Sequence, residues 1–186
     1  MSTYSLQEKF YLYKVRFNKD AEAFGHLYDL YIDKIFRFIF FKVSSREQAE
    51  DLTSEVFLKT WEYLTKPDVK VDNFNALIYR IARNAVIDYY RARRQDYLDE
   101  DEEVMESIQD ARSLETDLNT QLEFETVEKH LAKLKDAYRE VLLLKYIEEL
   151  SVGEIAKIIG KSSANVRVLI HRATNALKEL AGENHE

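Results

Sequence analysis

The sequence predicts an all-α protein: two small helical domains joined by an acidic linker, with a helix-turn-helix in the C-terminal domain. One proline and four glycines in 186 residues leave little of the tight-turn chemistry that an all-β fold requires. Apolar residues recur at steps of three and four over long stretches, which is typical of amphipathic helices. A block of acidic residues separates two such stretches and indicates a boundary between domains.

The acidic block sets the predicted domain boundaries. Residues 96–128 contain thirteen acidic residues and one basic residue, so the rest of the chain carries +5 although the whole chain carries −7. Like charges repel one another and extend a chain, and the run from Asp99 to Glu103 is entirely acidic. We therefore expect domains at 1–95 and 120–186 and a flexible linker at 96–119. The positive balance of the residues outside 96–128 leaves nucleic acid open as a partner.

Three helices are predicted in the first domain. Asp20 is the expected N-cap of a helix with one buried face. That face comprises Phe24, Leu27, Tyr28, Tyr31, Ile35, Phe38 and Ile39. Ser45 is the expected cap of the next helix, which ends before Pro67. Its expected core residues are Ala49, Leu52, Val56, Phe57 and Leu64. The third helix is expected from near Asn73 to about Arg94.

The second domain is also predicted to be helical, with segments at 122–134 and 137–147. Ser151 and Glu154 then form a capping box, in which each side chain bonds the free amide of the other residue. Gly160 is expected to end that helix in a left-handed turn. Ser162 or Ser163 caps the last helix, whose expected apolar face is Val166, Ile170, Ala173 and Leu177.

The two helices on either side of Gly160 have the helix-turn-helix pattern. The outward positions of the second helix are Ala164, Arg167, Val168, His171, Arg172 and Asn175. Arginine can reach guanine edges, and a small apolar side chain such as Val168 can contact a thymine methyl group. A helical hairpin with a solvated polar face is the alternative. The turn glycine, both caps and the exposed Val168 together favour DNA recognition.

A basic stripe is predicted along the third helix of the first domain. Leu77, Ile78, Ile81, Ala85 and Tyr89 form the expected buried face. The stripe consists of Arg80, Arg83, Arg91 and Arg94. Such a stripe suits a phosphate backbone, and the nearby Phe74, Tyr79 and Tyr90 suit stacking on unpaired bases. A solvated arginine face above a tyrosine core explains the same residues equally well.

The helix at 49–58, which continues to Trp61, places exposed acids beside apolar residues. Asp51 and Glu55 are the acids, and the mixture suits a protein contact with an aliphatic centre and an acidic rim. Trp61 itself is expected in the core. This pattern alone has low specificity, because many solvated helices share it.

Catalysis finds little support in the sequence. There is no cysteine and no glycine-rich phosphate loop, and the four histidines lack metal-ligand spacing. We expect a protein that is not an enzyme and that has no catalytic residues, metal site or cofactor. The longest apolar cluster, at 35–43, contains Arg37 and Lys42 and is too short and too charged to span a bilayer. The absence of cysteine fits a reducing cytoplasm.

These segments, in this order, resemble the extracytoplasmic-function (ECF) group of RNA polymerase sigma factors. Residues 49–52, 57, 58 and 61 resemble the helix by which that group binds core polymerase. Residues 74–84 and 87–89 resemble its helix for opening and reading the −10 element. Residues 138–144, 154–156 and 171–173 resemble its −35-reading domain. The resemblance covers about residues 20–94 and 122–180.

The resemblance implies a role for each segment. The polymerase clamp helices would meet Asp51, Leu52, Ser54, Glu55 and Leu58. The loop at 66–75 would hold a flipped −10 base, and the implied −10 residues are Asn73, Phe74, Asn75, Arg80, Arg83, Asn84 and Arg91. The implied −35 residues are Ser163, Asn165, Arg167, Val168, His171 and Arg172. The linker would run toward the active-site cleft and the RNA exit path, and an anti-sigma factor would be a further partner.

The sequence therefore predicts a cytoplasmic initiation factor that directs core RNA polymerase to promoter DNA without inserting into a membrane. Two alternatives remain. A stand-alone helix-turn-helix regulator would not need the basic stripe and the acidic helix of the first domain. A sigma mimic that binds an anti-sigma factor without binding DNA would not need to keep both basic segments.

Overall fold

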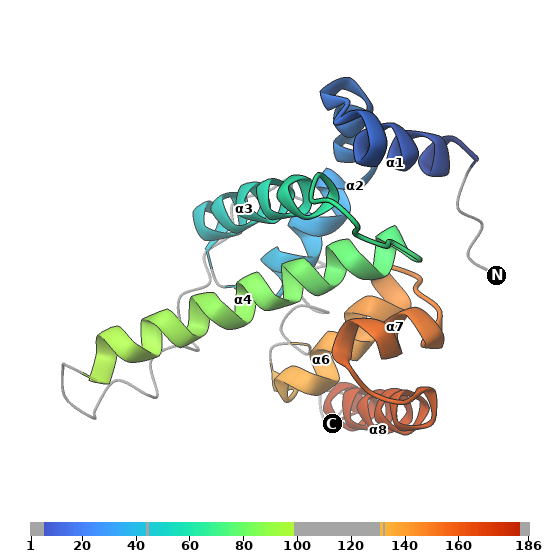
Figure 1. Cartoon of the computed structure of the whole chain (residues 1–186). Coiled ribbons are helices and arrows are strands. Elements are labelled where there is room, and N and C mark those ends of the chain that lie inside the picture. Colours follow the sequence, from blue (N-terminus) through green and yellow to red (C-terminus); the bar gives the residue numbers. More distant parts are fainter. Residues whose placement is uncertain (1–5, 44, 99–130, 132, 183–186) are drawn as a thin grey trace, which may run out of the picture. The chain divides into compact units, whose positions relative to one another are not determined.

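The structure, a computed structural model, describes residues 6–43, 45–98, 131 and 133–182 (Figure 1). The described elements are helical, which confirms the predicted fold class. The chain divides into two compact units, residues 1–112 and 113–186. Most of the acidic segment lies outside the described residues, so the linker boundaries at 96 and 119 stay a prediction.

Unit 1 contains four described helices: α1 (Leu6–Asn18), α2 (Ala21–Phe40), α3 (Arg46–Leu64) and α4 (Phe74–Leu98). Helix α1 packs on α2, α2 packs on α3, and α4 contacts both α2 and α3. Figure 1 shows α4 running alongside α3 as the longest helix of the unit. It extends four residues past the predicted end at Arg94.

Both predicted caps of unit 1 are confirmed. The Asp20 carboxylate accepts a hydrogen bond from the Ala23 amide at 3.0 Å. Ser45 Oγ accepts one from the Gln48 amide at 3.4 Å. The Ala23 amide, and then Lys14 at 3.4 Å, favour the charged carboxylate and hold the pKa of Asp20 below its usual value.

The predicted core of unit 1 is largely confirmed. Of the residues predicted on α2, Leu27, Tyr31, Ile35, Phe38 and Ile39 are buried. The prediction was wrong for Tyr28, which is exposed on one side while its ring packs against Phe57. Trp61 was predicted in the core, but it is partly exposed and packs edge-on against Phe24, with ring centroids 5.2 Å apart.

Helix α1 was not predicted from the sequence. Its apolar residues are distributed around the whole helix, so no single face stands out. Val15 is its buried residue and faces the rest of the unit. Several of its large apolar side chains remain exposed on the other side.

Unit 2 contains α6 (Asp136–Leu142), the π-helix η3 (Leu143–Ile147), α7 (Val152–Ile159) and α8 (Ser163–Gly182). Helix α6 packs on η3 and α8, and α7 packs on η3 and α8. The single helix predicted at 137–147 is thus an α-helix that widens into a π-helix. Most of the segment predicted at 122–134 lies outside the described residues.

The turn between α7 and α8 is built as predicted. Ser151 and Glu154 form the capping box, with the Ser151 amide donating to Glu154 Oε2 at 3.0 Å. Gly160 ends α7 at φ 66°, a left-handed conformation that costs glycine little. Ser162 caps α8, because its Oγ accepts a hydrogen bond from the Asn165 amide at 3.2 Å. These contacts fix the angle at which the last helix leaves the turn.

Candidate nucleic-acid and protein interfaces

Helix α8 presents the predicted face to solvent. Val166 and Ala173 are fully buried and anchor the helix. The exposed residues of its first three turns include Ala164, Asn165, Arg167, Val168, His171 and Arg172. Ser163 is partly buried where the helix begins. The core of unit 2 therefore holds the helix by its opposite side and leaves this face open.

That face carries an open hollow whose lining combines apolar, amide and cationic side chains. It is lined by Lys161, Asn165, Val168, Leu169 and Arg172. Val168 is 49% exposed and shares the hollow with Lys161 and Arg172. Lys161 was not among the predicted residues, although its place directly after the turn glycine was a usable signal. The hollow combines hydrogen-bond donors with a methyl-contacting surface, as a DNA-reading helix does.

Helix α4 carries the predicted cations on its outer side. Arg80, Asn84 and Arg91 are exposed, and Arg83 is partly exposed. Arg91 forms an ion pair with Asp88 at 3.1 Å, one turn earlier on the same helix. The side chain of Arg94 lies outside the described residues. The stripe is therefore present over the part of α4 that the structure describes.

The proposed stacking role of two aromatic residues was wrong. Phe74 and Tyr79 are each only 1% exposed. Phe74 packs edge-on against Tyr31 at 5.1 Å, and Tyr79 packs edge-on against Phe38 at 5.5 Å. Both rings belong to the core because α4 is covered by α2 as well as by α3. Phe74 is thus corrected from a −10 contact to a core residue.

Two other residues of this region have structural partners. Asn73 Oδ1 accepts a hydrogen bond from the Ala76 amide at 2.6 Å, which makes Asn73 the N-cap of α4. Tyr90 donates its hydroxyl to the Lys42 carbonyl at 2.5 Å and is only partly exposed. Asn75 lies in the first turn of α4 and is partly exposed. Asn73 therefore fixes where α4 begins, and Tyr90 ties a later turn of α4 to the residues that follow α2.

A hydrogen-bond chain that the sequence did not reveal holds a further cation near the end of α4. The Tyr89 hydroxyl donates to Gln48 Oε1 of α3. Arg93 donates to the same hydroxyl at 2.7 Å and lies over the Tyr89 ring, 5.6 Å from its centroid. Arg93 is therefore a positioned charge near the end of α4, on a different side of the helix from Arg80, Arg83 and Arg91. Tyr89 was predicted in the core but is partly exposed, and no sequence pattern indicated the hydrogen bonds of its hydroxyl group.

Helix α3 displays an acidic and apolar face. Asp51, Ser54 and Leu58 are exposed, and Glu55 is partly exposed and forms an ion pair with Lys59. Leu52 is 7% exposed and packs inward, so its predicted contact with polymerase is not available at this surface. The sequence analysis had placed Leu52 both on the core face and among the polymerase contacts, and the structure agrees with the core position.

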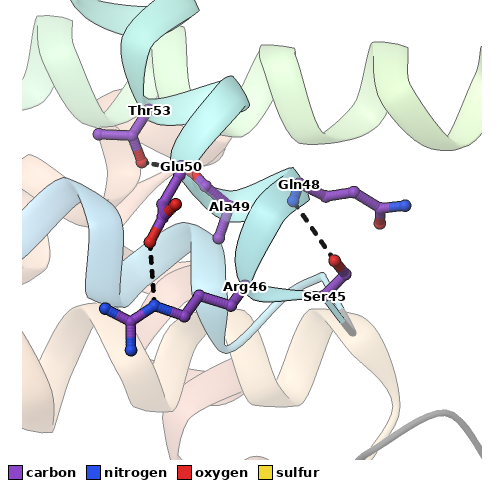
Figure 2. Close-up of polar contacts among 6 residues, drawn as sticks. All are labelled: Ser45, Arg46, Gln48, Ala49, Glu50 and Thr53. Carbon is purple, nitrogen blue, oxygen red and sulfur yellow. Dashed lines mark hydrogen bonds and ion pairs between the residues drawn. The ribbon is translucent and has the colours of Figure 1, made fainter.

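The first turns of α3 are held by local bonds (Figure 2). Arg46 donates to the Glu50 carboxylate at 2.9 Å, and Thr53 donates to the Ala49 carbonyl at 2.6 Å. Ser54 donates to the Glu50 carbonyl at 3.0 Å. The bonds of Arg46 and Ser54 lie at the exposed surface, whereas the bond of Thr53 satisfies a buried hydroxyl. Asp51 is exposed and forms no bond in the described part of the chain.

Two family models match the chain, one in each unit. The Sigma-70 region 2 model matches residues 27–95, and the Sigma-70, region 4 model matches residues 124–177. The ECF RNA polymerase sigma factor SigW of Bacillus subtilis is 33% identical over 168 residues, which cover 86% of this chain and 89% of SigW. The chain belongs to the ECF family of RNA polymerase sigma factors.

Other relatives give the same family. The ECF RNA polymerase sigma factor BldN of Streptomyces coelicolor is 31% identical over 87% of this chain, and the match covers 61% of BldN. The fold is that of CnrH in its complex with the cytosolic domain of CnrY, with a TM-score of 0.73 and 23% identity over 95% of this chain and 98% of that one. RpoE of Bartonella quintana, in complex with the anti-sigma factor NepR, has a TM-score of 0.71 and 22% identity over 86% of this chain and 96% of that one.

As an ECF sigma factor, the protein directs RNA polymerase to promoters and is not itself an enzyme. The region 2 match contains the faces of α3 and α4 described above, and the region 4 match contains the helix-turn-helix. Within the described residues, no group of three or more histidine, cysteine or acidic side chains is placed to hold a metal ion. In the same part of the chain, every helix is too short or too polar to cross a membrane.

Proposed function

We propose that this sigma factor reads the −35 element with the first three turns of α8. The observation that carries the proposal is the exposed hollow around Val168, which Lys161 and Arg172 also line. Arg167, His171 and Arg172 are exposed donors that can meet base edges, and Asn165 and Ser163 lie nearest the helix start. The N-terminal end of a helix also favours a phosphate. Val168 would contact a thymine methyl group.

Helix α4 would hold the opened −10 strand. Arg80, Arg83, Asn84 and Arg91 lie along its outer side, and Arg93 is held in place by Tyr89. Asn73 and Asn75 lie where the loop at 66–75 meets α4, and this loop would hold a flipped −10 base. Phe74 is buried next to that loop, so it would support the packing behind the loop and would not stack on DNA. Because phosphate contacts carry no sequence information, most of these arginines would position the strand.

The acidic face of α3 would bind the clamp helices of the polymerase largest subunit. Asp51, Glu55 and Leu58 supply a charged rim beside an exposed aliphatic side chain, with Ser54 next to them. In the cytoplasm an anti-sigma factor would compete for the protein. This is supported by RpoE, which was solved in complex with the anti-sigma factor NepR and whose fold this chain shares.

Run-off transcription tests the proposal directly. Core polymerase is given a pool of genomic promoters with and without the protein, and specific initiation is expected only with it. Arg167→Ala and Arg172→Ala are expected to weaken initiation at promoters with an intact −35 element. An absence of specific initiation would favour the sigma mimic, which binds an anti-sigma factor without DNA.

A second experiment tests the polymerase contact. Asp51→Lys is expected to weaken binding to core polymerase, because it reverses a charge at the centre of the proposed face. Glu50→Lys is the matched control: it makes the same charge change one residue earlier, about 100° around the helix. That control breaks only an exposed ion pair with Arg46, which contributes little to stability. Equal losses in both variants would reject Asp51 as a specific contact.

A further inference from the structure

Helix α1 carries an exposed apolar stripe that the proposed promoter and polymerase contacts do not use. Its members are Leu6, Phe10, Tyr13 and Phe17, between 55% and 86% exposed. They are separated by four, three and four residues, so they lie along one side of the helix. The rings of Tyr13 and Phe17 are 4.6 Å apart, which makes the stripe continuous there. The buried Val15 faces the opposite way.

Cations border the stripe on both sides. Lys9 and Arg16 lie on one flank and Lys14 on the other, by their positions around the helix. Lys14 lies over the Phe10 ring at 5.2 Å and also forms an ion pair with Asp20 at 3.4 Å. Arg16 lies over the Phe17 ring at 5.5 Å and donates a hydrogen bond to the Val69 carbonyl, so Lys9 is the cation of the three for which the described residues show no such bond. The acid of the helix is turned inward, because Glu8 accepts a hydrogen bond from the buried Tyr31 at 3.0 Å. The outward side of α1 is thus apolar at its centre and positive at its edges.

We propose that α1 binds peripherally to an anionic lipid surface and lies parallel to it. A helix that presents leucine and aromatic side chains between lysines and arginines has the composition of an interfacial helix. Phenylalanine and leucine enter the boundary of the acyl chains, tyrosine lies at the level of the headgroups, and the cations meet lipid phosphates. With 13 residues α1 is far too short to span a bilayer, so the association is peripheral.

Charge and size favour lipid over a protein occupant. A second copy of the same helix would bring the cations of both copies together, and like charges oppose that pairing. A 13-residue helix is about 20 Å long, and one face of it offers far less than the roughly 800 Å² per partner of a standard protein interface. Binding to a lipid surface needs no such minimum area, because its strength increases with each apolar side chain that is buried and each cation that meets the surface.

Sedimentation of the full chain with lipid vesicles tests the proposal. The protein is expected to bind vesicles of phosphatidylglycerol and phosphatidylcholine, and to bind phosphatidylcholine alone much more weakly. Phe10→Ser combined with Phe17→Ser is expected to lower binding roughly tenfold or more. Lys9→Gln combined with Lys14→Gln is expected to lower binding to the anionic vesicles by about fivefold per lysine.

Leu30→Ser is the matched control, because Leu30 is 47% exposed on α2 and lies outside the stripe. The control is expected to bind vesicles as the parent protein does. No binding to anionic vesicles, or an equal loss in the control, would overturn the proposal. Circular dichroism and thermal melting establish that each variant is folded.

Run-off transcription separates this proposal from the promoter function. The Phe10→Ser, Phe17→Ser variant is expected to support specific initiation at the level of the parent protein. If it loses initiation, the stripe serves a protein contact within the polymerase complex, and the lipid proposal is wrong. If the parent protein itself gives no initiation, the promoter function fails while the vesicle result stands.

Discussion

Helices α4 and α8 are both proposed to contact DNA, yet unit 1 and unit 2 hold them very differently. Helix α4 is packed between α2 and α3, and its aromatic residues Phe74 and Tyr79 are in the core. Arg93, near its end, is bonded to Tyr89. Helix α8 has just two buried residues, Val166 and Ala173.

The cations of the two helices differ in the same way. Arg91 and Arg93 of α4 are already bonded to neighbouring side chains. In the described part of the chain, Arg167 and Arg172 of α8 form no ion pair or hydrogen bond, so no internal bond has to break before they meet a base. The difference indicates that α4 supplies a preformed wall for the opened strand, whereas α8 supplies side chains that adapt to base edges.

The largest expected effect concerns the packing of α4 in the core of unit 1. Phe74→Ala removes a fully buried ring and is expected to lower the free energy of unfolding by about 3–5 kcal/mol. Urea denaturation followed by circular dichroism measures the loss. Phe74→Leu keeps much of the volume and is expected to retain most of the stability. If Phe74→Ala were as stable as the parent protein but failed to open promoters, Phe74 would be a base contact after all.

The next largest effect is expected for α8. Arg172→Ala is expected to cost about 1–3 kcal/mol of discrimination between a matched and a mutated −35 element, with no comparable loss of stability. Promoter competition with the polymerase complex measures the discrimination. Lys178→Ala, an exposed cation of the same helix about six residues later, is the control and should leave discrimination unchanged. Unchanged initiation by Arg172→Ala would reject this residue as the −35 reader.

The contrast between α4 and α8 also explains what the sequence could predict. For α8, all six positions that the prediction placed outside are exposed, and of the four predicted core residues Val166 and Ala173 are buried while Ile170 and Leu177 are partly exposed. For α4, two helices cover a wider arc than the predicted stripe that begins at Leu77, and the arc includes Phe74 and Tyr79. An aromatic residue has the same sequence signature whether it packs or stacks, so spacing alone left both roles open.

The other features that the sequence did not predict were long-range polar contacts and the partly exposed helix α1. The N-caps at Asp20, Ser45 and Ser151 were predicted because each depends on residues only three positions apart. The bond between Tyr89 and Gln48 joins residues 41 positions apart, and no local pattern reveals it. Helix α1 was missed because its apolar residues serve two faces, one packed and one exposed.

A smaller effect is expected at the start of α4. Asn73→Ala removes the N-cap and is expected to cost about 1 kcal/mol in the free energy of unfolding. Asn73→Ser keeps a capping oxygen and is expected to restore most of that stability. The two variants separate the capping role of Asn73 from a DNA contact. Because Asn73→Ser keeps the cap, its effect on promoter opening depends only on whether the side-chain amide of Asn73 also contacts DNA. Full opening by this variant would confine Asn73 to capping, and a loss despite normal stability would assign it to the −10 contact.

The smallest effect is expected where α4 is tied to α3. Tyr89→Phe removes the hydroxyl that joins Gln48 to Arg93 and is expected to cost about 0.5–1.5 kcal/mol in the free energy of unfolding. Gln48 and Arg93 are both partly exposed, so water can replace part of the lost bonding. The charge of Arg93 remains, and the dependence of promoter binding on salt should therefore keep its slope.

Arg93→Ala tests the charge of Arg93 separately from the hydrogen bond that holds it to Tyr89. It removes one cation and is expected to reduce the salt slope by about one while weakening binding uniformly across promoter sequences. Measuring promoter binding by the polymerase complex over a range of salt concentrations distinguishes the two variants. If Tyr89→Phe lowered the slope as much as Arg93→Ala does, the phosphate contact would depend on the bond to Tyr89, and the preformed wall would extend to the end of α4. An unchanged slope in both variants would remove Arg93 from the DNA interface and leave the stripe to the arginines at 80, 83 and 91.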